Sequence, residues 1–120
     1  MVSETTANWQ GAADACDALG MTLVSVPTEA RDDFLATLSD EPVWLGGRDP
    51  AFFTFPAFAN AAANTFSWLD GTVVGNINWA PGEPDATGGQ FCIEKSADVG
   101  RPWFDRACDE LKLYVCETAL

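Results

Sequence analysis

The stretch Trp79-Ala-Pro-Gly-Glu83-Pro84-Asp85 decides how this chain is interpreted. Two acidic side chains stand on either side of a proline, which fixes the backbone between them. An X–Pro bond is also the place where a cis peptide occurs at tolerable cost. Carboxylates that converge in this way suit a hard cation, above all calcium, because calcium prefers oxygen ligands. The sequence therefore predicts an oxygen-rich cation site on this loop.

The composition predicts one folded domain, residues 1–120, and disfavours several partners. The chain has 120 residues, of which 48% are hydrophobic and 12% aromatic, enough for one core. A net charge of −12 disfavours nucleic acid and membrane surfaces, because both attract positive charge. This acidity serves either solubility or the attraction of cations. No apolar run approaches the roughly 20 residues of a membrane helix, so no membrane insertion is expected. The first residues show no signal peptide, so we expect a module cut from a longer precursor.

The residue types exclude the commonest catalytic machinery. The chain contains no histidine, which removes the usual general base, the serine and cysteine triads and the common zinc ligands. Glu83 and Asp85 lie on one loop, whereas glycosidase carboxylates bracket the scissile bond. The sequence therefore predicts that the protein is not an enzyme.

The cysteines indicate an oxidising compartment. Their positions show no C-x-x-C spacing, which argues against a zinc site and a thioredoxin-like pair. An even number in a small domain favours two disulfides and therefore an extracellular location. Spacing alone permits three pairings, and four free thiols in a cytosolic protein are the alternative. The four residues are Cys16, Cys92, Cys108 and Cys116.

Hydrophobic periodicity predicts an α+β fold. The first helix is expected over 7–19, with Gly20 as its stop. The second helix opens at Pro27-Thr28-Glu29, with Thr28 as the cap, and ends at Pro42. Short strands are expected at 22–26, 43–46, 66–69, 91–94, 102–104 and 113–116. Helices first and then short strands favour α+β. The two predicted apolar stripes are Trp9, Ala12, Ala13, Cys16 and Leu19, and then Ala30, Phe34, Leu35 and Leu38.

Two long loops separate the later strands. The loop over 48–64 contains Phe52–Phe58, four phenylalanines in seven residues, which either pack onto the domain or form a contact surface for a partner. The loop over 71–90 holds five glycines and two prolines. Because long loops without secondary structure are usually functional in compact domains, the second loop is the expected binding region.

From Trp9 to Glu117 the order of the motifs resembles the C-type lectin domain, in the short form with two disulfides. The resemblance implies two helices, short antiparallel strands and a long ligand-binding loop region. It also implies the pairings Cys16–Cys116 and Cys92–Cys108. Only eight residues precede Trp9, so a shortened first strand with an exposed edge is expected. The matching motifs are Trp9-x-x-Ala12-x-x-x-Cys16, Leu23-Val24-Ser25, Trp44-Leu45-Gly46-Gly47, Phe66-x-Trp68-x-Asp70-Gly71, Asn78-Trp79, Pro81-Gly82-Glu83-Pro84 and Tyr114-Val115-Cys116-Glu117.

The resemblance further implies a weakened calcium site. The positions that correspond to the family's ligands hold Glu83, Asp85, Gln90 and Asp105, while Phe104 stands where an asparagine is usual. Calcium takes 6–8 oxygens, so the loss of one oxygen ligand and the exchange of a glutamate for Gln90 lower the expected affinity. The alternative is that these are solvated loop carboxylates of a domain without an ion.

The function implied by the resemblance is that of an extracellular carbohydrate-binding module, calcium-dependent and weak at each site. Glu83, Asp85, Gln90 and Asp105 would bind the sugar, and Phe104 could offer a stacking face. The hybrid triplet Glu-Pro-Asp names no particular sugar. Weak sites need several copies, so a homo-oligomer or a larger multidomain protein is expected. The alternative is a calcium-independent protein-binding domain that uses the Phe52–Phe58 loop or the acidic surface.

Overall fold

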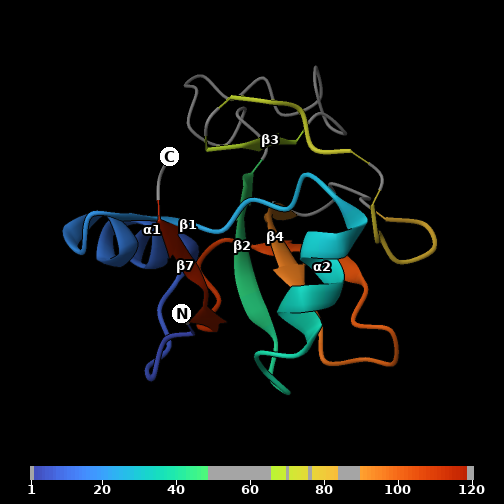
Figure 1. Ribbon diagram of the computed structural model, residues 1–120, viewed down its shortest axis with the longest axis horizontal. Coiled ribbons are helices and arrows are strands. Elements are labelled where there is room, and N and C mark those ends of the chain that lie inside the picture. Colours follow the sequence, from blue (N-terminus) through green and yellow to red (C-terminus); the bar gives the residue numbers. More distant parts are fainter. Residues whose placement is uncertain (1, 49–65, 70, 76, 84–89, 119–120) are drawn as a thin grey trace.

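The computed structural model describes residues 2–48, 66–69, 71–75, 77–83 and 90–118, without the side chains of residues 90 and 91 (Figure 1). The Phe52–Phe58 segment and the rest of the predicted loop after Arg48 lie outside these residues. The described elements are α1 (Trp9–Ala18), β1 (Met21–Leu23), α2 (Glu29–Ala36), β2 (Val43–Arg48), β3 (Ser67–Trp68), β4 (Gln90–Lys95), β5 (Trp103–Ala107), β6 (Leu113–Tyr114) and β7 (Cys116–Thr118).

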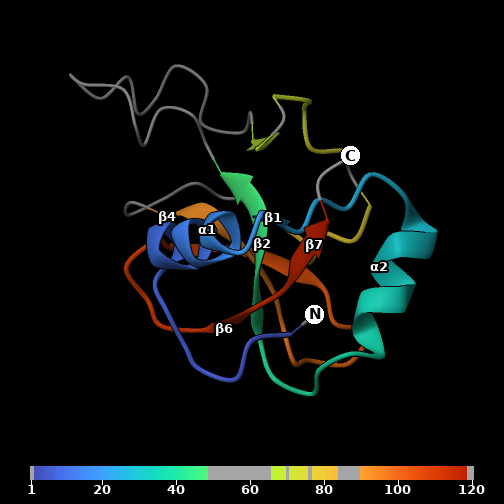
Figure 2. The ribbon, with the colours of Figure 1, turned by 60° about the vertical axis from the view of Figure 1, so that its left-hand side comes forward.

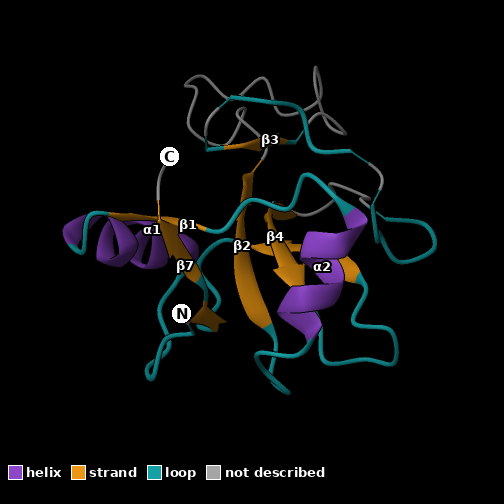
Figure 3. Ribbon diagram, in the orientation of Figure 1, coloured by secondary structure: helices purple, strands orange, loops and turns teal. Residues whose placement is uncertain are grey.

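The fold is α+β, as predicted, with two sheets between the helices. The larger sheet has the order β3-β2-β4-β5, and β6 pairs in parallel with β2. The smaller sheet pairs β1 with β7 in antiparallel register. In Figures 1 and 2, α1 and α2 lie on opposite sides of β2. Figure 3 shows that the described chain from β3 to β4 is mostly loop. The predicted loop over 71–90 is therefore confirmed for residues 71–75 and 77–83, whereas Gln90 already begins β4.

The first helix forms largely as predicted. The side chain of Asn8 caps it by accepting a hydrogen bond of 2.7 Å from the backbone N–H of Gly11. Gly20 follows with φ +73°, the left-handed conformation that ends many helices. Trp9, Ala12 and Cys16 are buried as the stripe predicted, whereas Leu19 is 59% exposed. Leu19 is the C-cap, where the helical periodicity no longer applies.

The second helix has the predicted cap but a different buried face. Thr28 Oγ1 accepts a hydrogen bond of 3.2 Å from the backbone N–H of Arg31. Leu35 is buried, but Phe34 is 59% exposed, and Asp32 is 3% exposed in place of the predicted apolar residues. Residues three apart lie on one helix face, so the orientation of α2 that buries Leu35 also buries Asp32.

Three further predictions for α2 were wrong. Ala30 is exposed, and Leu38, which lies beyond the helix, is 37% exposed. Pro42 does not end the helix, because α2 already ends at Ala36 with Thr37 as its C-cap. The helix buries the face of Asp32 and Leu35, so Ala30 and Phe34, which lie four apart on another face, are exposed.

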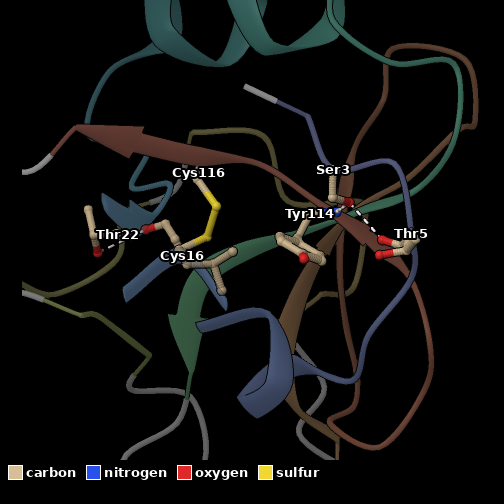
Figure 4. Close-up of a disulfide and its surroundings, with 7 residues drawn as sticks. Ser3, Thr5, Cys16, Thr22, Tyr114 and Cys116 are labelled. Carbon is tan, nitrogen blue, oxygen red and sulfur yellow. Dashed lines mark hydrogen bonds between the residues drawn. A yellow bond between two sulfur atoms is a disulfide. The ribbon is translucent and has the colours of Figure 1, made fainter. Parts of the chain in front are cut away.

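Both predicted disulfides are confirmed. Cys16–Cys116 joins α1 to β7 across a sequence separation of 100 residues (Figure 4). Cys92–Cys108 joins β4 to the residue after β5, with a separation of 16. Beside the first disulfide the backbone N–H of Tyr114 donates to Ser3 Oγ at 3.0 Å. Residues before α1 therefore contact the same C-terminal segment that the disulfide holds.

The core consists of two clusters of buried residues on either side of β2. The cluster toward α2 includes Leu45, Phe66, Trp68, Ile93 and Trp103. The cluster toward α1 includes Trp9, Trp44 and the four disulfide-bonded cysteines. Strand β2 contributes to both clusters, and at Gly46 its backbone lies close to the chain at Leu23 and Val24.

Gly46→Ala is expected to lower the free energy of unfolding by about 1–3 kcal/mol, because a Cβ there overpacks the core. The backbone N–H of Gly46 donates to Val24 O at 2.7 Å. An added Cβ would stand 2.5 Å from Leu23 O and 2.9 Å from Val24 O. Urea unfolding measures the loss. Gly75→Ala is the control, since nothing lies within 4 Å of an added Cβ there; equal losses would contradict the expectation.

Candidate functional site

A tight turn presents Glu83. Pro81 and Gly82 occupy its two central positions, and Gly82 has φ +83°, as a type II turn requires. The backbone N–H of Glu83 donates to Ala80 O at 2.9 Å and closes the turn. Proline presets the second position and glycine adopts the third without strain. The dipeptide Pro81-Gly82 thus sets the direction in which the chain reaches Glu83.

Backbone hydrogen bonds hold this turn against β5. The N–H of Trp103 donates to Asn78 O at 2.8 Å, and the N–H of Ala80 donates to Trp103 O at 3.0 Å. The indole rings of Trp79 and Trp103 meet edge to face, with centroids 5.6 Å apart, a favourable arrangement for aromatic pairs. The loop that carries Glu83 is therefore registered on the strand that carries Asp105.

Glu83 and Asp105 are brought together. Glu83 Oε1 accepts a hydrogen bond of 3.2 Å from the backbone N–H of Asp105. Glu83 is half-buried, and Asp105 is 1% exposed. Asp85 and the side chain of Gln90 lie outside the described residues, although the Gln90 backbone begins β4. The Glu83 carboxylate therefore lies against the backbone of Asp105, the residue predicted as a second ligand.

The donors present are of the kind that calcium prefers. Glu83 and Asp105 offer hard carboxylate oxygens, and Phe104 offers no side-chain oxygen at the position between Trp103 and Asp105. Within the described residues, no group of three or more His, Cys, Asp or Glu side chains is placed to hold a metal ion. The third carboxylate of the predicted set, on Asp85, is outside that part of the chain. The oxygen chemistry of the described pair fits calcium.

Phe104 contacts an arginine that sequence reasoning missed. The guanidinium carbon of Arg106 lies 4.6 Å from the centroid of the Phe104 ring, within cation–π range. Arg106 Nε donates to Glu94 Oε2 at 3.1 Å. Phe104 and Arg106 are two apart on β5, so their side chains share one face of the strand. That spacing was the signal in the sequence that could have paired them.

The surroundings of Arg106 stabilise its charge. Burial opposes the charged form, but the hydrogen bond to Glu94 and the negative charges nearby raise the pKa of the guanidinium above its ordinary value. Those charges belong to Glu94, Glu110 and Glu83. Because Glu83 is among them, Arg106 is electrostatically coupled to the candidate site.

A second missed residue, Asp32, lies at the centre of a buried polar cluster. Its Oδ1 accepts from Lys95 Nζ at 2.7 Å and from Trp103 Nε1 at 2.8 Å. Its Oδ2 accepts from Asn78 Nδ2 at 2.9 Å. The sequence signal was an aspartate three residues before a buried leucine, on the same helix face.

The fold and the site define a class: disulfide-bonded α+β domains that carry candidate ligands on a loop next to a strand. The model of the family "Lectin C-type domain" matches residues 5–118. The chain therefore belongs to the C-type lectin domain family, as the motifs in the sequence indicated.

The relatives in this family differ in what their names record. CD209 antigen-like protein D of Mus musculus is 32% identical over 96% of this chain and 45% of its own length. Type-2 ice-structuring protein of Osmerus mordax is 28% identical over 91% of this chain and 58% of its own. The chain thus spans less than two thirds of either relative.

Solved structures show the same fold. The carbohydrate-recognition domain of cow CD23, solved in the presence of a GlcNAc2Man3 oligosaccharide, matches with a TM-score of 0.77 and 30% identity, covering 96% of this chain and 82% of that one. A calcium-independent type II antifreeze protein matches with a TM-score of 0.80 and 25% identity, covering 96% and 81%. In the described part of this chain, no helix is both long and apolar enough to cross a membrane.

Proposed function

We propose that this chain is an extracellular carbohydrate-binding module whose site requires calcium and consists of Glu83, Asp85, Gln90 and Asp105. The observation that carries the proposal is the hydrogen bond from the Asp105 backbone N–H to Glu83 Oε1. It joins the two halves of the predicted ligand set, the loop after Pro81-Gly82 and strand β5. Two disulfides in a domain of this size support an oxidising, extracellular setting.

The residues have distinct roles in this proposal. Glu83 and Asp105 supply carboxylate oxygens, and Asp85 and Gln90 complete the set from the sequence. Calcium, when bound, would supply coordination positions for a pair of sugar hydroxyls. Carboxylates only accept hydrogen bonds, whereas the amide of Gln90 can also donate. A sugar at this site must therefore donate hydroxyl hydrogens to Glu83 and Asp85.

Glu83→Ala is expected to weaken calcium binding at least about tenfold, since even residues behind the metal ligands cost 10–100-fold when they are replaced. The substitution removes one carboxylate and the acceptor for the Asp105 N–H. Calorimetric titration with calcium measures the change. Glu41→Ala, which removes an exposed carboxylate elsewhere, is the control. Equal affinity in the wild type and the Glu83 variant would refute the assignment of this ligand.

A glycan array with and without a chelator tests the function itself. Binding of any glycan that is lost on chelation and restored by calcium is the expected result. Binding at a single site is expected to be weak, so the array should present glycans densely and use a multivalent form of the protein. An array that stays empty at millimolar calcium would remove the carbohydrate proposal.

The second candidate is a calcium-independent protein-binding domain. It is favoured by Phe104, which replaces an oxygen ligand and carries the Arg106 guanidinium over its ring. A fixed positive charge beside Glu83 offsets part of the repulsion that an ion would otherwise relieve. The structural likeness to a calcium-independent antifreeze protein is consistent with this alternative. No heat of calcium binding in the wild type, with a partner bound in chelator, is the outcome that favours it.

A further inference from the structure

We infer that the buried ion pair of Asp32 and Lys95 is a positioning device for the candidate site, because it holds the loop that carries Glu83 against β5. The inference rests on the proposed function. It adds Asp32 on α2 and Lys95 on β4, which are not among the proposed calcium ligands. The Asp32 and Lys95 side chains are only 5% and 3% exposed. A buried pair of this kind is weak evidence for stability, since apolar residues often replace such pairs without loss. What the pair holds in place is therefore the more informative question.

The Asp32 carboxylate connects three parts of the chain. It accepts hydrogen bonds from Lys95 on β4, from the indole of Trp103 on β5 and from the side-chain amide of Asn78 in the loop. The described loop after β3 passes on the α2 side of the molecule in Figures 1 and 2, where these contacts lie. Three donors to one buried carboxylate fix its orientation, and so fix all three donors relative to one another.

The second end of the network is the turn before β5. Lys95 Nζ donates to Arg101 O at 3.1 Å, and Asn78 Nδ2 lies 3.1 Å from the carbonyl oxygens of both Gly100 and Arg101. Arg101 has φ +50°, a conformation that costs energy for a residue other than glycine. The network stabilises this turn, because Lys95 and Asn78 donate hydrogen bonds to its carbonyl oxygens. Strand β5 therefore starts at a defined position relative to Asn78.

A continuous series of hydrogen bonds leads from Asp32 to the site. Asn78 accepts from the Trp103 N–H, and Trp103 accepts from the Ala80 N–H. The Glu83 N–H then donates to Ala80 O, and the Asp105 N–H donates to Glu83 Oε1. Each hydrogen bond holds the next residue of the series in place, and the last one reaches the two candidate ligands. These contacts hold the Glu83 carboxylate against the backbone of Asp105, which lowers the ordering that binding must impose.

The matched control lies on the same helix. Arg31 pairs with Glu117 of β7, whereas Asp32 accepts from Asn78 and Trp103. Arg31 is 42% exposed at its side chain. Arg31→Ala therefore removes an ion pair between α2 and a sheet without touching the network. A loss that follows from a loosened helix would appear in this variant as well.

The test compares Asp32→Asn, the double variant Asp32→Asn/Lys95→Met and Arg31→Ala by calorimetric titration with calcium. We expect Kd to rise about tenfold or more in the first two, the range found for residues behind metal ligands, and less than about twofold in Arg31→Ala. The double variant removes both charges of the pair, so neither is left buried without its partner, and it keeps the test available if the single variant fails to fold. A Kd in folded Asp32 variants equal to that of Arg31→Ala would overturn the inference.

Hydrogen exchange without calcium separates this inference from the proposed function. The amides of Ala80, Glu83 and Asp105 are expected to exchange about tenfold faster in the Asp32 variants, while the Gly46 amide, bonded to Val24 O in the core, changes less than about twofold. If amide exchange at Gly46 accelerates equally, the pair only stabilises the fold as a whole, and the inference is overturned. If the wild type binds no calcium, the calcium site fails, and the exchange pattern alone decides whether the pair positions Glu83.

Discussion

Replacing Cys16 and Cys116 by alanine is expected to lower the free energy of unfolding by about 4.7 kcal/mol, the chain-entropy value for a loop of about 100 residues. The two residues are 100 apart in the sequence. Without the bond the unfolded chain gains conformations that the disulfide excludes. Both cysteines are almost fully buried, at 0% and 2% exposure, so lost packing adds to the effect.

The second disulfide supplies the comparison. Cys92 and Cys108 are 16 residues apart, so alanine at both is expected to cost about 3 kcal/mol. Urea unfolding of both double variants, without reductant, gives the two losses. A small domain is stabilised by only about 5–15 kcal/mol in total, so the first variant should show a clearly lower midpoint. A larger loss from the short loop than from the long one would contradict the entropic account.

Lys95→Met is expected to lower the free energy of unfolding by about 3–5 kcal/mol, because it leaves a buried carboxylate without its cation. Methionine is also unbranched and long, so little packing volume is lost. The Asp32 carboxylate keeps hydrogen bonds from Asn78 and Trp103, but these neutral donors do not balance its charge. The loss is measured by urea unfolding at neutral pH.

The double variant Asp32→Asn/Lys95→Met completes this experiment. Removing both charges should restore part of the stability, and the coupling between the two sites is expected to be about 0.5–3 kcal/mol. Arg31→Met, at a pair with a partly exposed arginine, is the control and should cost no more than about 1 kcal/mol. If Lys95→Met costs no more than this control, the buried pair carries no unpaired-charge penalty.

Part of the candidate site could be predicted from the sequence, and part is visible only in the structure. The sequence predicted only that the stretch over 71–90 is a long loop, and the structure shows that Pro81 and Gly82 form a tight turn in it, because proline and glycine restrict a turn locally. The resemblance implied that the carboxylates of Glu83 and Asp105 share one ion, which stays a prediction, whereas the structure shows a hydrogen bond from the Asp105 backbone N–H to Glu83 Oε1. Arg106 over Phe104 was not predicted. Because side chains alternate along β5, Phe104 and Arg106 lie on one face of the strand, but whether that face is covered depends on segments distant in the sequence.

The sequence by itself determined the elements whose causes are local. The predicted Thr28 cap and Gly20 stop depend on a few neighbouring residues, as do the Asn8 cap and the Pro81-Gly82 turn that the structure shows. The tertiary structure alone decided that α2 buries Asp32 and exposes Phe34. A charged side chain is buried only where partners meet it, and Lys95, Trp103 and Asn78 come from positions 46 to 71 residues away. No local pattern contains that information, because the partners become neighbours only after the chain has folded.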